Sequence, residues 1–437
     1  MIRKISIDRM LVFSPSMQII LRAEIKGCKN ILSIKKAIMY AVQKFEILNS
    51  RVLQDEEGEC YYVTKENFTM PYIEIRNYIQ SAQEFVNEQE KIQFNFEGGE
   101  LIRFIVSVHN NKIILSIVQH HLAGDGKSAL LFLQEIMENL EKVDNGEIIS
   151  ISRDEMVPIQ MYTKKYLSQF VEVGELEKIF LEEVNNEWRK SNPKIFRFQD
   201  LHELFESYWK CHRSKVATAT ISEHVVKQFS AMCKKNKVTV NNAIITSILK
   251  DLEKKQKISI IVDLRTEDFK KPGNYAGGFL IEVQYNPKIG FWENAKNVQK
   301  LVSDYLNDRT KLMLAFLLNE CMDKSFIDGT NFQYAGRIEN NILREYNSLR
   351  LLKEEYPLIV SNLGINQIKE RYGKFKIEGL SFFSPVTVGF STNVSIITEN
   401  GKMVINIQSI DCDIEYQKVL DELVRQMKSD YIMNESC

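Results

Sequence analysis

Two adjacent histidines, followed at fixed spacing by an aspartate and a glycine, form the most chemically suggestive segment of the chain. The segment reads His120-His121-Leu122-Ala123-Gly124-Asp125-Gly126. It follows the apolar, β-branched run 113–118, which is short enough for a buried strand. It precedes residues 127–140, where apolar side chains recur at helical spacing. The sequence therefore predicts a loop between a strand and a helix, where reacting side chains are commonly held.

Four interpretations of this loop compete. A P-loop would need a glycine where the chain has His121, so that the backbone could wrap phosphate. A metal site lacks ligands, because His120 and His121 point to opposite sides of extended backbone and Asp125 adds only one. Two structural core histidines would not explain the Asp-Gly that follows at fixed spacing. General-base catalysis fits best, because imidazole exchanges a proton near neutral pH.

The spacing His120-His121-x-x-x-Asp125-Gly126 resembles the HHxxxDG motif of condensation domains and chloramphenicol-acetyltransferase-like acyltransferases. In that family the second histidine is the base, so the resemblance implies that His121 is catalytic and His120 supports it. It also implies that Asp125 pairs with an arginine and holds the loop, and Arg265 is the candidate partner. Gly126 is expected to leave the substrate channel open.

Weaker similarities to the same family extend over most of the chain. They lie in residues 94–104, 238–243, 273–279 and 357–364, and the length is similar to that of stand-alone, alcohol-acetyltransferase-like members. The resemblance implies two chloramphenicol-acetyltransferase-like sandwich lobes with an active-site tunnel between them. We expect an N-terminal lobe over 1–145, a connecting segment over 146–212 and a C-terminal lobe over 213–437.

The order of predicted elements supports the same fold class. Strands and helices mix without regular alternation, which favours an α+β protein with mixed sheets and helices packed on them. Residues 382–398 and 402–408 predict two paired strands, joined by an Asn-Gly turn at 400–401. The connecting segment predicts a single amphipathic helix near 175–188.

Composition limits the partners and the compartment. The chain has 437 residues, 44% hydrophobic and 26% charged, with a net charge of −1, so neither nucleic acid nor an anionic membrane is the expected partner. No apolar run is long enough for a transmembrane segment, and the N-terminus lacks the apolar stretch of a secretory signal. Seven scattered cysteines show no disulfide or zinc spacing, which indicates reduced thiols and a cytoplasmic protein.

Several other polar residues need an interpretation. Gly389-Phe390-Ser391-Thr392-Asn393 begins like a nucleophile elbow but lacks its second glycine and lies within predicted strands, which argues against a serine hydrolase. Ser391 and Asn393 could line the channel or donate to an oxyanion, or they could be solvent-facing strand residues. His109 is expected in an exposed turn, and His202 and His212 are expected to be structural or surface groups.

The sequence thus predicts an acyltransferase that moves an acyl group from a thioester to an alcohol or amine, with no covalent intermediate. The expected donor is a thioester of coenzyme A or phosphopantetheine, used as a substrate, and no tightly bound cofactor or metal is expected. One alternative is a condensation enzyme that forms an amide or ester with acyl or peptidyl carrier proteins as partners. Another is a non-catalytic module that binds acyl donors.

Overall fold

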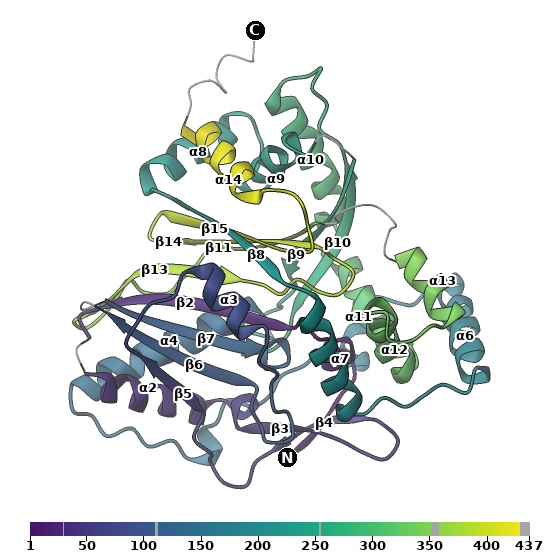
Figure 1. Ribbon diagram of the computed structural model, residues 1–437, viewed down its shortest axis with the longest axis horizontal. Helices are drawn as coiled ribbons and strands as arrows, with labels where there is room; N and C mark the ends of the chain where they lie inside the picture. Colours follow the sequence, from purple (N-terminus) through teal and green to yellow (C-terminus); the bar gives the residue numbers. More distant parts are fainter. Residues whose placement is uncertain (29, 110–111, 253–254, 351–357, 429–437) are drawn as a thin grey trace.

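Two mixed six-stranded sheets and one three-stranded sheet form the framework of the computed structural model (Figure 1). The structure describes the chain except residues 29, 110–111, 253–254, 351–357 and 429–437. Helices pack on both large sheets, so the predicted α+β, two-lobed fold is confirmed. None of the described helices is long and apolar enough to cross a membrane.

The first large sheet carries the histidine loop. In spatial order its strands are β12 (Arg371–Tyr372), β13 (Phe375–Phe383), β2 (Gln18–Lys26), β7 (Lys112–His120), β6 (Ile102–His109) and β5 (Tyr72–Arg76). All neighbours are antiparallel except β5 and β6. Helices α2 (Ile31–Lys44) and α4 (Gly126–Asp144) bury their apolar sides in the same core as this sheet. We call this sheet with its helices the first unit.

A small sheet and three short elements complete the first unit. The sheet contains β1 (Ile2–Ile5), β4 (Cys60–Thr64) and β3 (Ser50–Gln54), in that order. The other elements are α1 (Arg9–Val12), the 3-10 helix η1 (Glu46–Asn49) and α3 (Ala82–Gln89). The chain leaves α1 toward Met17, whose carbonyl accepts a 2.7 Å hydrogen bond from the main chain of His121. This part of the first unit therefore helps to hold the histidine loop.

The second large sheet forms the second unit. Its spatial order is β10 (Ala276–Val283), β9 (Gln256–Asp263), β11 (Leu358–Ile365), β14 (Thr392–Glu399), β15 (Lys402–Ile410) and β8 (Ser214–Ile221). Strand β11 runs parallel to both of its neighbours, and the other pairs are antiparallel. Helices α8 (Glu223–Lys235), α9 (Val240–Lys250), α10 (Phe291–Leu306) and α14 (Tyr416–Lys428) cover the face away from the first unit (Figure 1).

The prediction of a single strand over 382–398 is wrong. Strand β13 ends at Phe383 in the first sheet, and β14 begins at Thr392 in the second sheet. The connection contains Pro385, which cannot donate to a sheet ladder, and Gly389, whose φ of 90° interrupts extended backbone. The first sheet therefore takes two strands from the C-terminal third of the chain. The lobe boundaries at 145 and 213 stay predictions.

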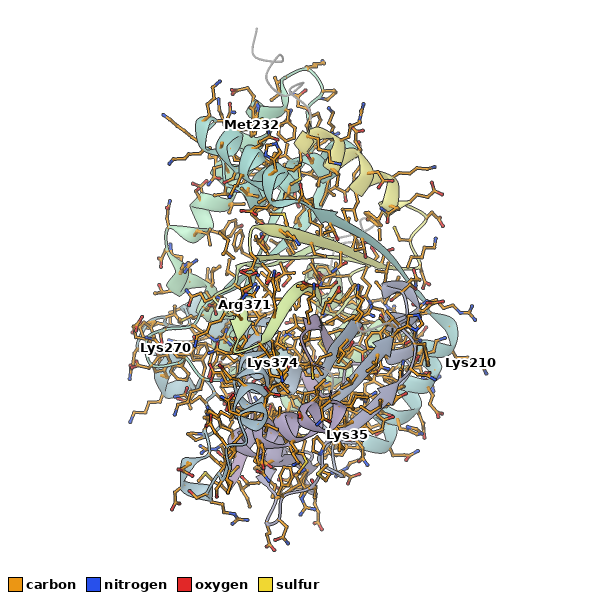
Figure 2. The ribbon with its side chains drawn as sticks, turned by 90° about the vertical axis from the view of Figure 1, so that its left-hand side faces the viewer. Lys35, Lys210, Met232, Lys270, Arg371 and Lys374 are labelled. Carbon is orange, nitrogen blue, oxygen red and sulfur yellow. The ribbon has the colours of Figure 1, made fainter. Side chains whose placement is uncertain are left out.

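The β12–β13 hairpin is fastened to the first unit at its turn. Lys374 in this turn forms a 2.6 Å ion pair with Asp144 at the end of α4. Figure 2 labels Arg371 on β12 and Lys374 in the turn that follows it. The predicted Asn-Gly turn between β14 and β15 is confirmed, because Asn400 and Gly401 have positive φ angles of 48° and 77° and link antiparallel strands.

The connecting segment contains more helix than predicted. It holds α5 (Lys164–Leu167), α6 (Glu175–Lys190) and α7 (Phe198–Cys211), so the prediction of one helix is wrong. Helix α7 has a clear apolar side that the sequence already showed, in Leu201, Leu204, Tyr208 and Trp209. Helix α6 packs with later helices around Trp188 and Phe326. These helices are α11 (Leu314–Cys321), which follows the 3-10 helix η4 (Arg309–Met313), α12 (Lys324–Tyr334) and α13 (Asn341–Arg350).

A fully buried ion pair joins this helical cluster to the first unit. Arg9 of α1 donates to both carboxylate oxygens of Asp328 on α12, at 2.8 and 2.5 Å, and both side chains are 1% exposed. We expect Asp328→Ala to lower the free energy of unfolding by about 3–5 kcal/mol, because it leaves the guanidinium buried without its counter-ion. Replacing both residues, with Arg9→Met and Asp328→Leu, should cost less than the single change. Urea denaturation of the three variants measures this, and equal losses would contradict the expectation.

Candidate active site

The histidine loop has the predicted position between a strand and a helix. Strand β7 ends at His120, residues His121–Ala123 form a 3-10 turn, and α4 begins at Gly126. Asp125 caps the helix, because its Oδ1 accepts a 3.0 Å hydrogen bond from the main-chain nitrogen of Ser128. Gly124 has a φ of 131°, which side chains other than glycine rarely adopt. Local hydrogen bonding thus fixes where both histidines lie.

His120 faces inward and is 5% exposed. Its ring lies edge-on to Phe94 and Phe96, at centroid distances of 5.5 and 4.9 Å. Its Nδ1 accepts a 3.1 Å hydrogen bond from the main chain of Leu122, which requires that this nitrogen carry no proton. Burial, helped by the neighbouring His121 and Arg103, lowers the pKa of His120 to about 3. The inward, supporting position predicted for His120 agrees with these contacts.

His121 is the first residue of the 3-10 turn and is partly exposed. Its Nδ1 is buried, and no described residue gives it a well-oriented hydrogen bond. Burial lowers the pKa of His121 below its ordinary value, while the Asp125 carboxylate and the residue's own main-chain carbonyl oppose that shift. The imidazole is therefore neutral at pH 7 and able to accept a proton.

Asp125 and Arg265 form the predicted ion pair, with 2.7 Å between Nη2 and Oδ1. They are 140 positions apart and join the first unit to the second. The second oxygen of Asp125 accepts a 3.1 Å hydrogen bond from the main chain of Tyr275. Burial opposes the charge of Arg265, but Asp125 and Asp263 raise the pKa of its guanidinium above the ordinary value.

A second ion pair extends this contact into a row of alternating charges. Arg265 Nη1 donates to Asp263 Oδ1 at 3.0 Å, and Lys127 of α4 binds the other oxygen of Asp263 at 2.7 Å. The side chains thus form a spatial row of alternating charge across the junction between the two units. Its order is Lys127, Asp263, Arg265 and Asp125. The pairing lets all four groups remain charged although Asp125 and Arg265 are mostly buried.

Three further residues near Asp125 belong to the site. Ser128 Oγ binds Asp125 at 3.1 Å and the carbonyl of Gly273 at 3.0 Å. The guanidinium of Arg265 lies 4.7 Å from the ring centroid of Tyr275. Gly273 and Tyr275 belong to the segment 273–279, which the sequence had singled out by its family similarity, although not for these contacts. Ser128 was missed, and its only signal was a polar residue in the first turn of a mostly apolar helix.

Gly126 is explained by packing. A Cβ atom at Gly126 would lie 2.8 Å from Leu363 Cδ2 and 2.9 Å from two ring atoms of Phe382. These side chains come from β11 of the second sheet and β13 of the first. The glycine thus allows the start of α4 to approach both strands, so the space predicted as an open channel beside it is filled. The tunnel itself stays a prediction.

The two polar residues predicted for the channel differ in their surroundings. Asn393 is 2% exposed, and its amide donates to the carbonyl of Pro385 at 2.8 Å while its oxygen accepts from Ser384 at 2.7 Å. Because its side chain is almost fully buried, Asn393 is poorly placed to bind an oxyanion. Ser391 is partly exposed and its buried Oγ has no partner among the described residues. Of the two, Ser391 is the more accessible donor.

The remaining histidines and the cysteines lie elsewhere. His109 is exposed at the end of β6, His202 contacts Gln93 at 2.8 Å on an exposed surface, and His212 binds Asp411. The six described cysteines are free thiols. No group of three or more His, Cys, Asp or Glu residues in the described ranges could hold a metal ion.

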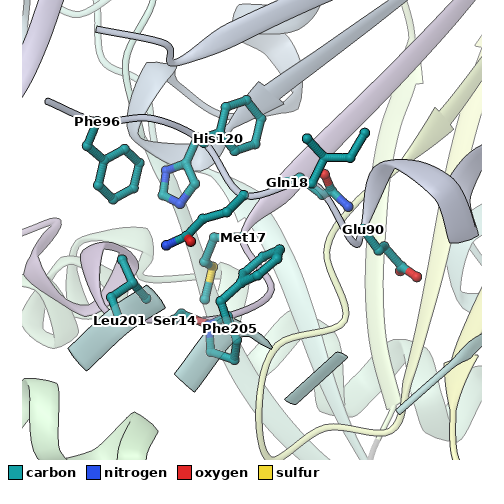
Figure 3. Close-up of a pocket in the computed structure, with 12 residues that line it drawn as sticks. Ser14, Met17, Gln18, Glu90, Phe96, His120, Leu201 and Phe205 are labelled. Carbon is teal, nitrogen blue, oxygen red and sulfur yellow. The ribbon is translucent and has the colours of Figure 1, made fainter. Parts of the chain in front are cut away.

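A small pocket lies on the His120 side of the loop (Figure 3). Met17, Phe96 and Phe205 contribute to its wall, with His120 directed toward it. About 20 Å³ of it is accessible to water, room for about one water molecule. The pocket is too small for a thioester substrate, which agrees with a structural role for His120.

Comparison with solved structures shows that the fold is the one shared by condensation domains and acetyltransferases. The first condensation domain of the CDA synthetase superposes with a TM-score of 0.64 at 12% identity, over 99% of this chain and 96% of that one. TRI3 trichothecene 15-O-acetyltransferase from Fusarium sporotrichioides gives 0.69 at 11% identity, over 98% and 94%. The epimerization domain TycB3(E) of tyrocidine synthetase B gives 0.58 at 12% identity, over 98% and 93%. No protein-family model matches the sequence, and no curated protein matches it.

These likenesses confirm the fold expected from the HHxxxDG resemblance. The chain has the two-lobed, chloramphenicol-acetyltransferase-like architecture over nearly its whole length. Identities of 11–12% establish the architecture and leave the reaction to be argued from the site itself.

The Asp125–Arg265 pair can be tested by a double-mutant cycle. We expect Arg265→Gln to lower the free energy of unfolding by about 3–5 kcal/mol, because it leaves the Asp125 carboxylate buried without its counter-ion. Asp125→Asn should cost less, because Arg265 keeps its ion pair with Asp263. The double variant should recover part of this loss. Denaturant unfolding of the four proteins gives the coupling energy, and a value within error of zero would refute a stabilising pair.

Burial of His120 predicts a loss of stability in acid. The unfolded histidine binds a proton near its ordinary pKa of 6.5, whereas the folded one does so only near pH 3. Between these values the unfolded state binds more protons, so stability falls as the pH falls from about 6.5 toward 3. The melting temperature of the wild type should therefore fall more between pH 7 and pH 5 than that of His120→Gln. Equal slopes would show that His120 also takes up its proton in the folded protein.

Proposed function

We propose that this protein is an acyltransferase in which His121 is the general base. The observation that carries the proposal is a neutral, partly exposed imidazole in a loop that residues from both units hold in place. The fold, shared with condensation domains and an acetyltransferase, supports the same reaction class. The donor is a thioester of coenzyme A or phosphopantetheine, and the acceptor is an alcohol or an amine.

The chemistry follows from the two sides of the imidazole. We take Nδ1, which is buried and has no partner among the described residues, to carry the ring proton, so that Nε2 has the free electron pair. Nε2 removes the acceptor's proton as the acceptor oxygen or nitrogen attacks the thioester carbonyl. The tetrahedral intermediate then collapses, the carbon–sulfur bond breaks, and the protonated imidazole returns the proton to the leaving thiolate. No bond forms between the acyl group and the protein.

Asp125 acts on this chemistry indirectly. Its carboxylate is surrounded by Ser128, Arg265 and the main chain of Tyr275, so it has no free position from which to exchange a proton with substrate. Its charge raises the pKa of His121, which offsets part of the effect of burial. Asp125 therefore positions the loop and keeps the imidazole basic enough to act.

The developing oxyanion needs a hydrogen-bond donor. Ser391 is the candidate, because it is partly exposed and its hydroxyl has no partner among the described residues, whereas Asn393 is almost fully buried. A donor of this kind stabilises the charge that appears as the tetrahedral intermediate forms.

A carrier-protein-dependent condensation enzyme is the second candidate. Its support is the match to a condensation domain over 99% of this chain. A carrier-bound donor and a coenzyme A donor present the same thioester, so the two candidates differ only in what holds the pantetheine arm. Thiol release from a panel of acyl-CoA and acyl-carrier-protein donors, measured with alcohol and amine acceptors, distinguishes them. Donor binding without turnover would instead favour a non-catalytic binding module.

His121→Ala should reduce kcat by about 10²–10⁴-fold, the usual contribution of a general base, while the melting temperature changes little. His109→Ala, which changes an exposed histidine at the end of β6, should keep the wild-type rate.

In the wild type, kcat/KM should fall only below the ordinary histidine pKa of 6.5, because burial lowers the pKa of His121. Thiol release measured from pH 4 to 8 tests both expectations. A wild-type rate in His121→Ala would contradict the assignment of His121 as the general base.

A further inference from the structure

A buried arginine lies in a cleft between the two large sheets, away from the histidine loop. Arg22 is on β2, four residues from Gln18, which is paired with His120, so it lies about 13 Å farther along the strand. About 370 Å³ of the cleft is accessible to water. Residues from both sheets line it, among them Arg22, Gln80, Ser381, Thr218, Thr220 and Lys402. In Figure 1 this is the region where β2 and β13 face β15 and β8.

Arg22 is a cation without a counter-ion among the described residues. It is 8% exposed, yet no carboxylate of the described ranges lies within ion-pair distance of it. Its Nη2 donates to the carbonyl of Gln80 at 3.0 Å, and its buried Nε has no partner in the part of the chain that the structure describes. Burial lowers the pKa of Arg22 to about 10. A buried charge is normally paired, so this guanidinium is suited to bind an anion.

Packing holds the guanidinium in a fixed orientation. Its central carbon lies 4.7 Å from the ring centroid of Phe85, and the Gln80 carbonyl fixes one nitrogen. A planar guanidinium held in this way can still present its other N–H groups to an oxyanion.

Hydroxyl groups flank Arg22 on both neighbouring strands. Ser116 on β7 and Ser381 on β13 are its directly paired residues, so the three side chains lie on the same face of the sheet. Ser116 Oγ is buried and has no partner among the described residues. Ser381 Oγ accepts a 3.0 Å hydrogen bond from Asn406 of the second sheet, which leaves its own proton available. A cation and two hydroxyl donors thus lie side by side.

The carboxylates that line the same cleft do not neutralise Arg22. Glu24 pairs with Lys112 at 2.7 Å, and Glu378 pairs with Lys26 at 3.2 Å. Glu399 accepts a hydrogen bond from Asn400, and burial raises its pKa, which favours its neutral form. Each of these carboxyl groups is therefore either paired with a lysine or favoured in its neutral form, and none of them balances the charge of Arg22.

We propose that this cleft is a binding site for a small oxyanion, the carboxylate or phosphate group of a metabolite, with Arg22 as its principal ligand. Ser381 and Ser116 supply further donors beside it. The site is separate from the histidine loop and does not depend on the acyl-transfer reaction.

The test compares wild type with Arg22→Met, which removes the charge and keeps an apolar side chain of similar length. Lys36→Gln is the matched control, because it removes an exposed cation on α2 that does not line the cleft. Calorimetric titrations with succinate and with inorganic phosphate, at constant ionic strength set with sodium chloride, distinguish the two sources of an oxyanion. The ligand-free melting temperature of each variant is measured alongside.

We expect saturable binding of at least one of the two anions to wild type and to Lys36→Gln, and at least a tenfold loss of affinity in Arg22→Met. The ligand-free melting temperature of Arg22→Met should equal or exceed that of wild type, because an unpaired buried charge opposes folding. Three results would each overturn the proposal. These are no saturable binding of either anion to wild type, unchanged affinity in Arg22→Met, and a marked fall in its melting temperature, which would assign Arg22 to packing.

Discussion

The ion pair between Asp125 and Arg265 is the interaction on which the rest of the site depends. Asp125 caps α4, ends the histidine loop and accepts hydrogen bonds from both units. Replacing a buried pair of this kind with apolar residues is often neutral or stabilising, so its contribution is to geometry more than to net stability. Guanidinium and carboxylate bind in few orientations, which fixes how α4 meets the second sheet. The position of His121 is thereby linked to a residue in the other unit.

The same loop gives two adjacent histidines opposite environments. His120 lies between two phenylalanine rings, and its Nδ1 is engaged by the main chain, so it has neither the charge nor the access for proton transfer. His121 is partly exposed to solvent, and the negative charge of the Asp125 carboxylate acts to raise its pKa. The backbone changes from extended at His120 to a 3-10 turn at His121, and the two rings therefore have different surroundings.

Local patterns in the sequence predicted the strand, loop and helix around His120, because each depends on residues close in the chain. The Asn400-Gly401 turn was predictable for the same reason. The path of residues 375–399 could not be predicted in this way. Strands β13 and β14 have similarly apolar sequences, and nothing local says that one joins the first sheet and the other the second. The partner of Asp125 came from the family resemblance, since no spacing rule connects residues 140 positions apart.

The crossing of β13 also brings polar contacts between the two sheets, beside the apolar ones that Ile397 and Leu363 make with the first core. Asn406 of the second sheet donates to Ser381 Oγ at 3.0 Å and to the carbonyl of Phe382 at 2.9 Å, both on β13. Farther along, Glu90 of the first unit accepts a 2.7 Å hydrogen bond from Ser214 of β8. Burial raises the pKa of Glu90 to about 8, so this carboxyl is neutral at pH 7 and no charge is buried there.

Directional bonds of this kind fix the relative orientation of two sheets without filling the space between them, whereas apolar packing closes such space. A junction built this way leaves room for a polar cleft. This is the physical reason why the buried charge of Arg22 lies between the sheets and not in either core.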